Sequence, residues 1–213
     1  MKIGRLHVIT DTSLQSTHDH VALAAAALAG GAPVIQLRDK KASSHALLAA
    51  AREVAALCRR HRASLIVNDR ADIAWAADAA GVHLGEDDLP LAVARQLLGA
   101  DRILGASADR AEEAIQRAEA GADYAGIGPV FATRSKANTG PVLGLEGLAA
   151  AVRVSPIPLV AIGGITLENL DSVLATGVHG VALLSAVCLA SDPTEAVKEA
   201  VRVLELHPIG VVS

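Results

Sequence analysis

Aromatic residues are almost absent from this chain of 213 residues, of which 52% are hydrophobic but only 1% aromatic. With one Trp, one Tyr and one Phe, the chain lacks the stacking platforms on which proteins bind single-stranded nucleic acid. An excess of positive charge is missing too, since 19 Lys and Arg face 23 Asp and Glu, a formal net charge of −4. Without a positive field to attract phosphate backbones, nucleic acid is not an expected partner.

Cysteine is equally scarce, because Cys58 and Cys188 are the only two and neither has the CxxC spacing of a metal or redox site. Two distant cysteines cannot serve as a disulfide framework, which favours a reducing compartment. The most apolar run, residues 21–35, is mostly alanine, and two glycines and a proline break it, so it is not expected to span a bilayer. The N-terminus lacks the ordered regions of a signal peptide. We therefore expect a soluble cytoplasmic protein that binds no membrane.

Short apolar runs alternate with longer runs rich in Ala, Leu, Glu and Arg. Each short run is nearly all apolar rather than alternating, as is typical of parallel strands that are covered on both faces. We expect strands at residues 6–10, 34–37, 65–68, 81–84, 102–105, 124–128, 159–162 and 180–184. We expect helices at residues 20–29, 44–61, 71–79, 91–98, 111–120, 146–154, 167–175 and 194–206.

This alternation predicts the α/β class and, within it, a single (β/α)8 TIM barrel with a parallel eight-stranded core. The repeat of about 26 residues per strand–helix unit is slightly short for that fold. A doubly wound open sheet is the alternative, which eight equal units make less favoured. No Pro/Ser-rich linker or block of charge divides the sequence, so residues 1–213 are expected to form one domain.

Polar residues, two glycines and one leucine lie at or just after the ends of most predicted strands, and in such a barrel these ends form the face that carries the active site. They are Gln36, Arg38, Asp39 and Lys40; Asn68 and Asp69; Glu86, Asp87 and Asp88; Ser107; Thr133, Arg134, Ser135 and Lys136; Gly163 and Gly164; and Leu184 and Ser185. The longest irregular stretch, residues 130–145, falls at the same face, and loops of that length are usually functional.

Two groups of these residues suit anions. The Gly163–Gly164 turn is expected to open a helix near Thr166, and backbone N–H groups at helix starts after strands seven and eight often bind a phosphate. Glycines that only make a tight turn are the alternative. Separately, Arg38, Lys40 and Lys136 can converge on a second group richer in charge than a monophosphate, unless they simply balance Asp39 and nearby acids at a solvated rim.

Carboxylates at the ends of strands three and four suit a divalent cation. Asp69 and Asp88 could hold Mg²⁺ with substrate oxygens as its remaining ligands. Alternatively Asn68, Asp69 and Asp88 precede helices and could be N-caps. His7 and His83 lie within strands and are expected to be packed core histidines, since neither has a partner at the spacing of a nucleophile triad.

Five motifs make the chain resemble the thiamine phosphate synthase family. They are VIQLRDK at residues 34–40, LIVNDRADIA at 65–74, GVHLGEDDLP at 81–90, GADYAGIGPVFATRSK at 121–136 and AIGGI at 161–165. The resemblance runs in order along essentially the whole chain. It implies an enzyme that joins 4-amino-2-methyl-5-hydroxymethylpyrimidine diphosphate to thiazole ethyl phosphate, releasing pyrophosphate and forming thiamine phosphate.

The resemblance also implies roles for particular residues. The pyrimidine diphosphate would bind Gln36, Arg38, Lys40, Asn68, Ser107 and Lys136, of which Arg38, Lys40, Lys136 and Ser107 would be catalytic. Mg²⁺ would bind Asp69 and Asp88, and the thiazole phosphate would bind Thr133, Ser135, Gly164, Leu184 and Ser185. A homo-oligomer, a dimer, is the expected assembly, with the small phosphorylated substrates as the other partners.

Two alternatives remain open. A thiazole tautomerase of the same superfamily would isomerise a single substrate without metal, and a non-catalytic regulatory protein would only bind a phosphorylated ligand. The sequence departs from the synthase pattern at Glu86, Ser135 and Asp109, although Ser135 retains a hydroxyl. It keeps the cationic residues and the Thr-x-Ser-Lys stretch that tautomerases tend to lose, and it carries Pro129 where a tautomerase has histidine. The synthase is therefore favoured.

Overall fold

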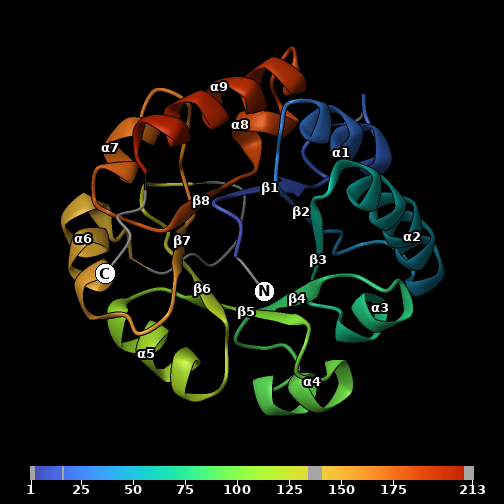
Figure 1. The fold of residues 1–213 in the computed structure, drawn as a ribbon, viewed down its shortest axis with the longest axis horizontal. Helices are drawn as coiled ribbons and strands as arrows, with labels where there is room; N and C mark the ends of the chain where they lie inside the picture. The colour runs from blue at the N-terminus through green and yellow to red at the C-terminus, as the bar shows by residue number, and fades with distance from the viewer. Residues whose placement is uncertain (1–2, 16, 134–140, 209–213) are drawn as a thin grey trace.

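Eight parallel strands form a closed barrel in sequence order, and helices surround it (Figure 1). The structure is a computed structural model, and it describes residues 3–15, 17–133 and 141–208. Each strand pairs with its neighbours in the chain, and β8 (Gly180–Leu183) closes the ring on β1 (Leu6–Thr10), with Leu6 opposite Val181. The predicted (β/α)8 barrel is confirmed.

The remaining strands agree with the sequence expectation to within a few residues. They are β2 (Val34–Leu37), β3 (Ser64–Asn68), β4 (Gly81–Leu84), β5 (Ile103–Ala108), β6 (Tyr124–Ile127) and β7 (Leu159–Ala161). The helices are α1 (His20–Ala29), α2 (Ser44–His61), α3 (Ala71–Ala76), α4 (Leu91–Leu98), α5 (Ala111–Glu119), α6 (Gly144–Val154), α7 (Leu170–Leu174), α8 (Ser185–Cys188) and α9 (Pro193–Leu206).

Four elements differ from expectation. α3 ends at Ala76, three residues before its expected end at residue 79. β5 continues to Ala108, so Ser107 lies within the strand and not after it. The helix expected at residues 167–175 is reduced to α7, because the N–H of Thr166 donates to Asn169 Oδ1 (2.9 Å) in a turn that precedes the helix. A short additional helix, α8, follows β8 directly.

Alternation along the strands divides the apolar residues between two clusters. In β1, Leu6 and Val8 belong to the larger cluster that packs against the helices, whereas Ile9 belongs to a smaller cluster with Tyr124 and Val160. Since successive strand residues point to opposite faces, the smaller cluster fills the inside of the barrel. Apart from Tyr124, aliphatic side chains supply this packing, which explains how the fold forms with so few aromatic residues.

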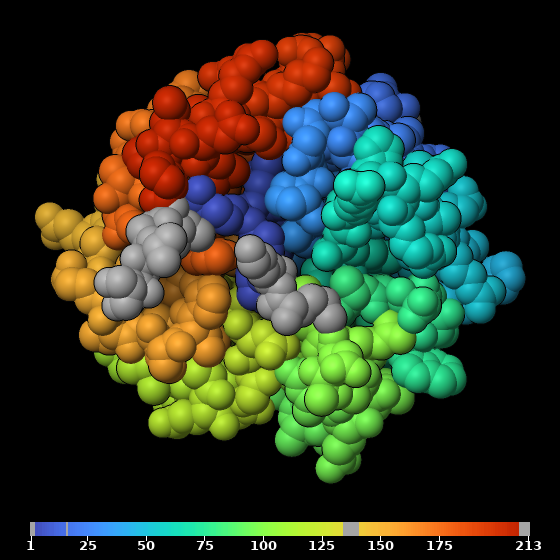
Figure 2. Space-filling model, viewed as in Figure 1, coloured from blue at the N-terminus to red at the C-terminus, as the bar shows by residue number. Residues whose placement is uncertain are grey.

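The helices form a continuous shell that runs in sequence order around the barrel (Figure 2). Early and late parts of the chain meet in this shell, where α1 lies beside α9 (Figure 1). Arg5 joins the same parts, because its guanidinium donates to the carbonyl oxygens of His179 and Leu204, both at 3.0 Å. Within the described residues, no helix is long and apolar enough to cross a membrane.

Candidate active site

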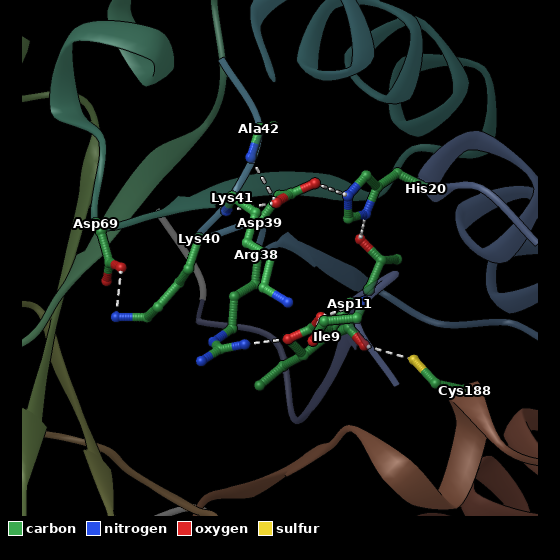
Figure 3. A network of polar contacts seen from close by, with 12 residues as sticks. Ile9, Asp11, His20, Arg38, Asp39, Lys40, Lys41, Ala42, Asp69 and Cys188 are labelled. Carbon is green, nitrogen blue, oxygen red and sulfur yellow. Dashed lines mark hydrogen bonds and ion pairs between the residues drawn. The ribbon is translucent and has the colours of Figure 1, made fainter. Parts of the chain in front are cut away.

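The loop that follows β2 carries the first cationic side chains of the site (Figure 3). The backbone N–H of Arg38 donates to the carbonyl of Thr10 (3.1 Å), which continues the pairing of β1 with β2 past the end of β2. Arg38 and Asp11 therefore lie side by side, and the Arg38 guanidinium forms an ion pair with the buried Asp11 carboxylate. Ser13 also donates to Asp11, from its N–H (2.9 Å) and its hydroxyl (2.6 Å).

Asp39, in the same loop, is part of the scaffold and is not a counter-charge for Arg38 or Lys40. Its carboxylate accepts hydrogen bonds from the N–H groups of Lys41 (2.8 Å) and Ala42 (2.9 Å), and it contacts His20 Nε2 (3.2 Å). Burial opposes ionisation of Asp39, but these three hydrogen bonds outweigh it and hold its pKa below the usual value. His20 is in turn bonded to the Thr10 hydroxyl at 2.9 Å, so the loop is tied to β1 and α1.

Lys40 points the other way, towards β3 (Figure 3). Its ammonium lies 3.0 Å from Asp69 Oδ2, and about half of the lysine side chain is exposed. Asp69 has a positive φ of 66°, and its N–H donates to the carbonyl of His83 in β4 (2.8 Å). This left-handed conformation brings Asp69 to the carboxyl end of the barrel beside the residues that follow β4.

Asp88 faces Asp69 from the loop after β4. One of its oxygens accepts the N–H of Gly85 at 2.6 Å. Burial raises the pKa of Asp88, and the neighbouring Asp69 carboxyl raises it further. The two carboxyls repel each other, and Lys40 is the cation beside Asp69. Negative charge is therefore concentrated at this part of the rim.

The N-cap alternative is wrong for these residues. α3 has Arg70 at its N-cap and α4 has Pro90, and neither helix has a side-chain cap. The carboxylates of Asp69 and Asp88 are thus not used to cap the helices that follow them. Glu86, the departure from the family pattern in this loop, is exposed.

The inner face of the barrel supplies neutral polar groups below this rim. Gln36 is buried in β2, and Asn68 is half-buried at the end of β3, opposite His83 of β4. Ser107 is half-buried in β5, and its hydroxyl lies 3.1 Å from His83 Nε2. His83 is a buried core histidine, as the sequence predicts, but it is also bonded to a predicted site residue.

The loops after β6 and β7 pack tightly against each other. A Cβ atom on Gly164 would lie 2.7 Å from the carbonyl oxygen of Ala132, and Gly164 has a positive φ of 67°, so only glycine fits this turn. The N–H of Phe131 donates to the carbonyl of Gly163 (3.0 Å), which places half-buried Thr133 near this turn. The expected helix near Thr166 is wrong, because α7 starts at Leu170.

Half-buried Leu184 and Ser185 lie where β8 passes into α8. Leu184 is the N-cap of α8 and Ser185 its first residue, so the N–H groups of the first turn point out of the helix start. Among the described residues, neither the N–H of Gly164 nor that of Ser185 donates to a protein acceptor. Three residues named from the sequence, Arg134, Ser135 and Lys136, lie outside the described residues.

Sequence reasoning missed the residues that hold the predicted ones in place. Asp11, His20 and Tyr124 are buried residues of this kind, the first directly after β1, the second in α1 and the third in β6. Asp11 directly follows the first strand, so the rule that pointed to the ends of the other seven strands could have included it. Nothing in the spacing of His20 or Tyr124 points to such a role.

The two carboxylates fit a magnesium ion. The described residues contain no group of three or more His, Cys, Asp or Glu side chains arranged to hold a metal. Mg²⁺ does not need such a group, because it is commonly bound by one or two carboxylates together with substrate phosphates and water. The mutual repulsion of Asp69 and Asp88, which raises the pKa of Asp88, is the electrostatic condition that a cation relieves.

Fold and site together define an enzyme-type (β/α)8 barrel, with cationic, acidic and backbone N–H groups gathered at the carboxyl ends of its strands. The family model described as thiamine monophosphate synthase matches residues 6–187. The chain belongs to this family.

Relatives and solved structures agree with this assignment. A thiamine-phosphate synthase of Salinibacter ruber is 50% identical over 194 residues, which cover 91% of this chain and 86% of the relative. One of Chloroflexus aurantiacus is 46% identical over 195 residues, covering 92% and 90%. The structure is similar to that of thiamine phosphate pyrophosphorylase from Pyrococcus furiosus, with a TM-score of 0.87, 41% identity, and coverage of 95% and 96%.

Proposed function

We propose that this protein is a transferase that makes thiamine phosphate from the pyrimidine diphosphate and the thiazole ethyl phosphate, with release of pyrophosphate. The observation that carries the proposal is the 50% identity to a thiamine-phosphate synthase over nine-tenths of the chain. The arrangement of Arg38, Lys40, Asp69 and Asp88 at one rim of the barrel supports it.

Stabilisation of a leaving diphosphate is the main chemical requirement of this reaction. The proposed course is ionisation, in which pyrophosphate departs before the thiazole nitrogen attacks. Arg38, held by Asp11, presents a guanidinium whose geometry suits phosphate oxygens. Lys40 forms an ion pair with Asp69 and is half-exposed, so its ammonium can move to contact the diphosphate. Lys136 is proposed as a third cation.

Asp69 and Asp88 are the residues that would hold Mg²⁺. Bound there, the ion would supply charge neutralisation to the departing pyrophosphate. Burial and the neighbouring Asp69 carboxyl raise the pKa of Asp88, and a cation bound there would favour the ionised form by offsetting Asp69. Gln36, Asn68 and Ser107 would orient the pyrimidine with neutral hydrogen-bonding groups.

The phosphate of the thiazole would bind at the loops after β6, β7 and β8. The free N–H groups of Gly164 and Ser185 are donors of the kind that phosphates accept. Thr133, Ser135 and Leu184 would complete this subsite. Holding the thiazole by its phosphate places the attacking nitrogen and so lowers the entropy cost of the second step.

The family match and the synthase names of the relatives support this function over the two alternatives. A tautomerase would turn over a single thiazole substrate without metal, and a regulatory protein would bind ligand without turnover. We propose, further, that the protein works as a homodimer in the cytoplasm. Sedimentation equilibrium and localisation of a tagged chain test these two points.

The decisive experiment incubates the purified protein with both substrates and Mg²⁺ and measures thiamine phosphate. Product that requires both substrates and disappears with EDTA is expected, whereas folded protein that makes no product would contradict the proposal. Lys40→Ala should lower kcat by about 10²- to 10³-fold, as loss of a transition-state charge contact does. Lys41→Ala is the matched control, since Lys41 is its exposed neighbour and should retain activity.

A further inference from the structure

Three polar side chains form a hydrogen-bonded row across the inside of the barrel. The Tyr124 hydroxyl in β6 lies 3.0 Å from His83 Nδ1 in β4, and His83 Nε2 lies 3.1 Å from the Ser107 hydroxyl in β5. Tyr124 and His83 are buried, whereas Ser107 is half-buried. The row therefore starts in the core and ends at the site.

Tyr124 has no freedom to turn its hydroxyl elsewhere. A Cβ atom on Gly105 would lie 2.3 to 2.5 Å from the tyrosine ring and its oxygen, so the ring occupies the space that the missing side chain leaves. Burial raises the pKa of Tyr124, and the hydroxyl therefore keeps its proton. Among the described residues, His83 Nδ1 is the only acceptor that this hydroxyl contacts.

The buried proton of the Tyr124 hydroxyl determines which atom donates and which accepts in each hydrogen bond of the row. If Tyr124 donates, His83 Nδ1 must be unprotonated, and in the neutral ring the hydrogen is then on Nε2. Nε2–H donates to the Ser107 oxygen, which leaves the serine hydrogen directed away from the histidine. The opposite direction would leave the Tyr124 proton buried without an acceptor, which is the more costly arrangement.

We propose that Tyr124 and His83 are positioning residues that make Ser107 a hydrogen-bond donor to the pyrimidine diphosphate. The inference rests on the proposed function, which gives Ser107 this ligand. Diphosphate oxygens and ring nitrogens are acceptors, so a serine that presents its hydrogen suits them, and one that presents lone pairs does not. The Ser107 backbone is also fixed, because its carbonyl accepts from Arg117 Nε at 3.0 Å.

The tautomer of His83 is measured directly by nitrogen NMR of protein labelled at its histidines, without substrates. We expect Nε2 to carry the hydrogen, and Tyr124→Phe to remove this preference or change the Nδ1 signal. An Nδ1–H tautomer in the unmodified protein would overturn the proposal. This readout is independent of turnover, so a protein without synthase activity would refute the proposed function and leave the tautomer result intact.

Kinetics test the consequence for the ligand. Tyr124→Phe should raise KM for the pyrimidine diphosphate by about tenfold, the loss of one hydrogen bond to a charged acceptor, with little change in KM for the thiazole phosphate. Because the tyrosine acts only through the serine, Tyr124→Phe should cost nothing further in a Ser107→Ala background. Equal losses in the two backgrounds, or equal effects on both KM values, would overturn the proposal.

His7→Phe is the matched control for a change inside the barrel. His7 is also buried, and its ring centroid lies 5.1 Å from that of Tyr124. Its hydrogen bond within the described part of the chain goes to the Gly4 carbonyl and not to Ser107. Burial is the largest cause that lowers the pKa of His7, to about 3, so the wild-type ring is neutral and the replacement removes no charge. We expect unchanged KM values, and thermal unfolding of each variant shows whether its barrel is intact.

Discussion

Two aspartate–arginine pairs of this protein differ in their surroundings and therefore in what they contribute. Asp11 and Arg38 have side chains that are 3% and 17% exposed, whereas in the pair of Asp72 and Arg70 they are 60% and 35% exposed. Water screens the second pair, and such pairs add little to stability. In the first pair, loss of one partner leaves the other charged and desolvated.

Asp11→Asn should therefore lower the free energy of unfolding by about 3 kcal/mol, because it leaves the Arg38 charge unpaired. It should also raise KM for the pyrimidine diphosphate, since the guanidinium loses its orientation. Denaturant unfolding and steady-state kinetics measure the two effects. Asp72→Asn is the control, expected to change stability by about 1 kcal/mol or less and to leave kinetics unchanged. Similar effects of the two variants would contradict the positioning of Arg38 by Asp11.

Replacing Asp88 should stabilise the fold, whereas replacing Asp11 should destabilise it. The folded-state pKa of Asp88 is raised, by burial first and by Asp69 second, so its ionised form destabilises the fold at neutral pH. Asp88→Asn should raise the melting temperature slightly at pH 7 in EDTA, because the amide keeps an oxygen for the Gly85 N–H. The gain should vanish as the pH falls through the raised pKa and protonates the wild-type carboxyl.

With Mg²⁺ present, the wild type should have a higher melting temperature than Asp88→Asn. The ion should stabilise the wild type, by relieving the repulsion between Asp69 and Asp88, and have less effect on Asp88→Asn. Thermal unfolding with and without the metal checks this. Equal stabilisation of both proteins would argue against metal binding at these carboxylates.

At the level of single residues, the sequence predicts which side chains reach the rim but not which ones hold them. Lys40, Asp69 and Asp88 could be predicted to converge because strand ends meet at one face of a barrel. The contact of Asp11 with Arg38 follows from the register of β1 with β2, and that of Tyr124 with His83 from side chains crossing the barrel interior. Neither distance is encoded in spacing along the chain.

At the scale of helices and strands, local composition explains which bounds the sequence predicts correctly and which it does not. Strands β2 and β4 are apolar apart from Gln36 and His83 and have clear ends, so their bounds agree with expectation. β5 ends in Ala-Ser-Ala, which has little preference for a strand, and it stays extended because Ser107 pairs with Gly126 of β6. α8 follows β8 in one continuous apolar run, which hides the boundary between strand and helix.

The turn after β7 is expected to hold the whole loop after β6 in position. Gly164→Ala should displace the loop after β6, since the new Cβ would lie 2.7 Å from the Ala132 oxygen and the Phe131 Cβ. KM for the thiazole phosphate should rise by about tenfold, as for loss of a backbone hydrogen bond to a charged group. Steady-state kinetics with each substrate varied in turn checks this.

Gly121→Ala separates steric displacement from backbone strain. Gly121 also has a positive φ, 94°, but a Cβ there meets no atom within 4 Å. Both variants should lose about 1 kcal/mol or more from the strained backbone, and only Gly164→Ala should affect the thiazole phosphate. Normal kinetics for Gly164→Ala would show that the turn does not shape the phosphate subsite.

For the whole molecule, the two cysteines report on global opening. Cys58 and Cys188 are both free and buried, and burial raises both thiol pKa values, that of Cys58 to about 12. Neither should react with a thiol reagent in the folded protein at neutral pH, whereas both should react in denaturant. Usually about one molecule in 10³ or fewer is unfolded at any moment. Labelling should therefore be slower in buffer than in denaturant by about 10³-fold or more. Rapid labelling of either thiol would reveal local opening.

The closure of β8 on β1 has a consequence for how the protein is made. A ribosome releases the chain from its N-terminus, and until Gly180–Leu183 has emerged β1 lacks one of its two neighbours. Seven strands would leave two unpaired edges, which are templates for association with other chains. Arg5 likewise lacks its acceptors at His179 and Leu204 until late in synthesis. The nascent barrel therefore exposes two strand edges until its final strand has been made.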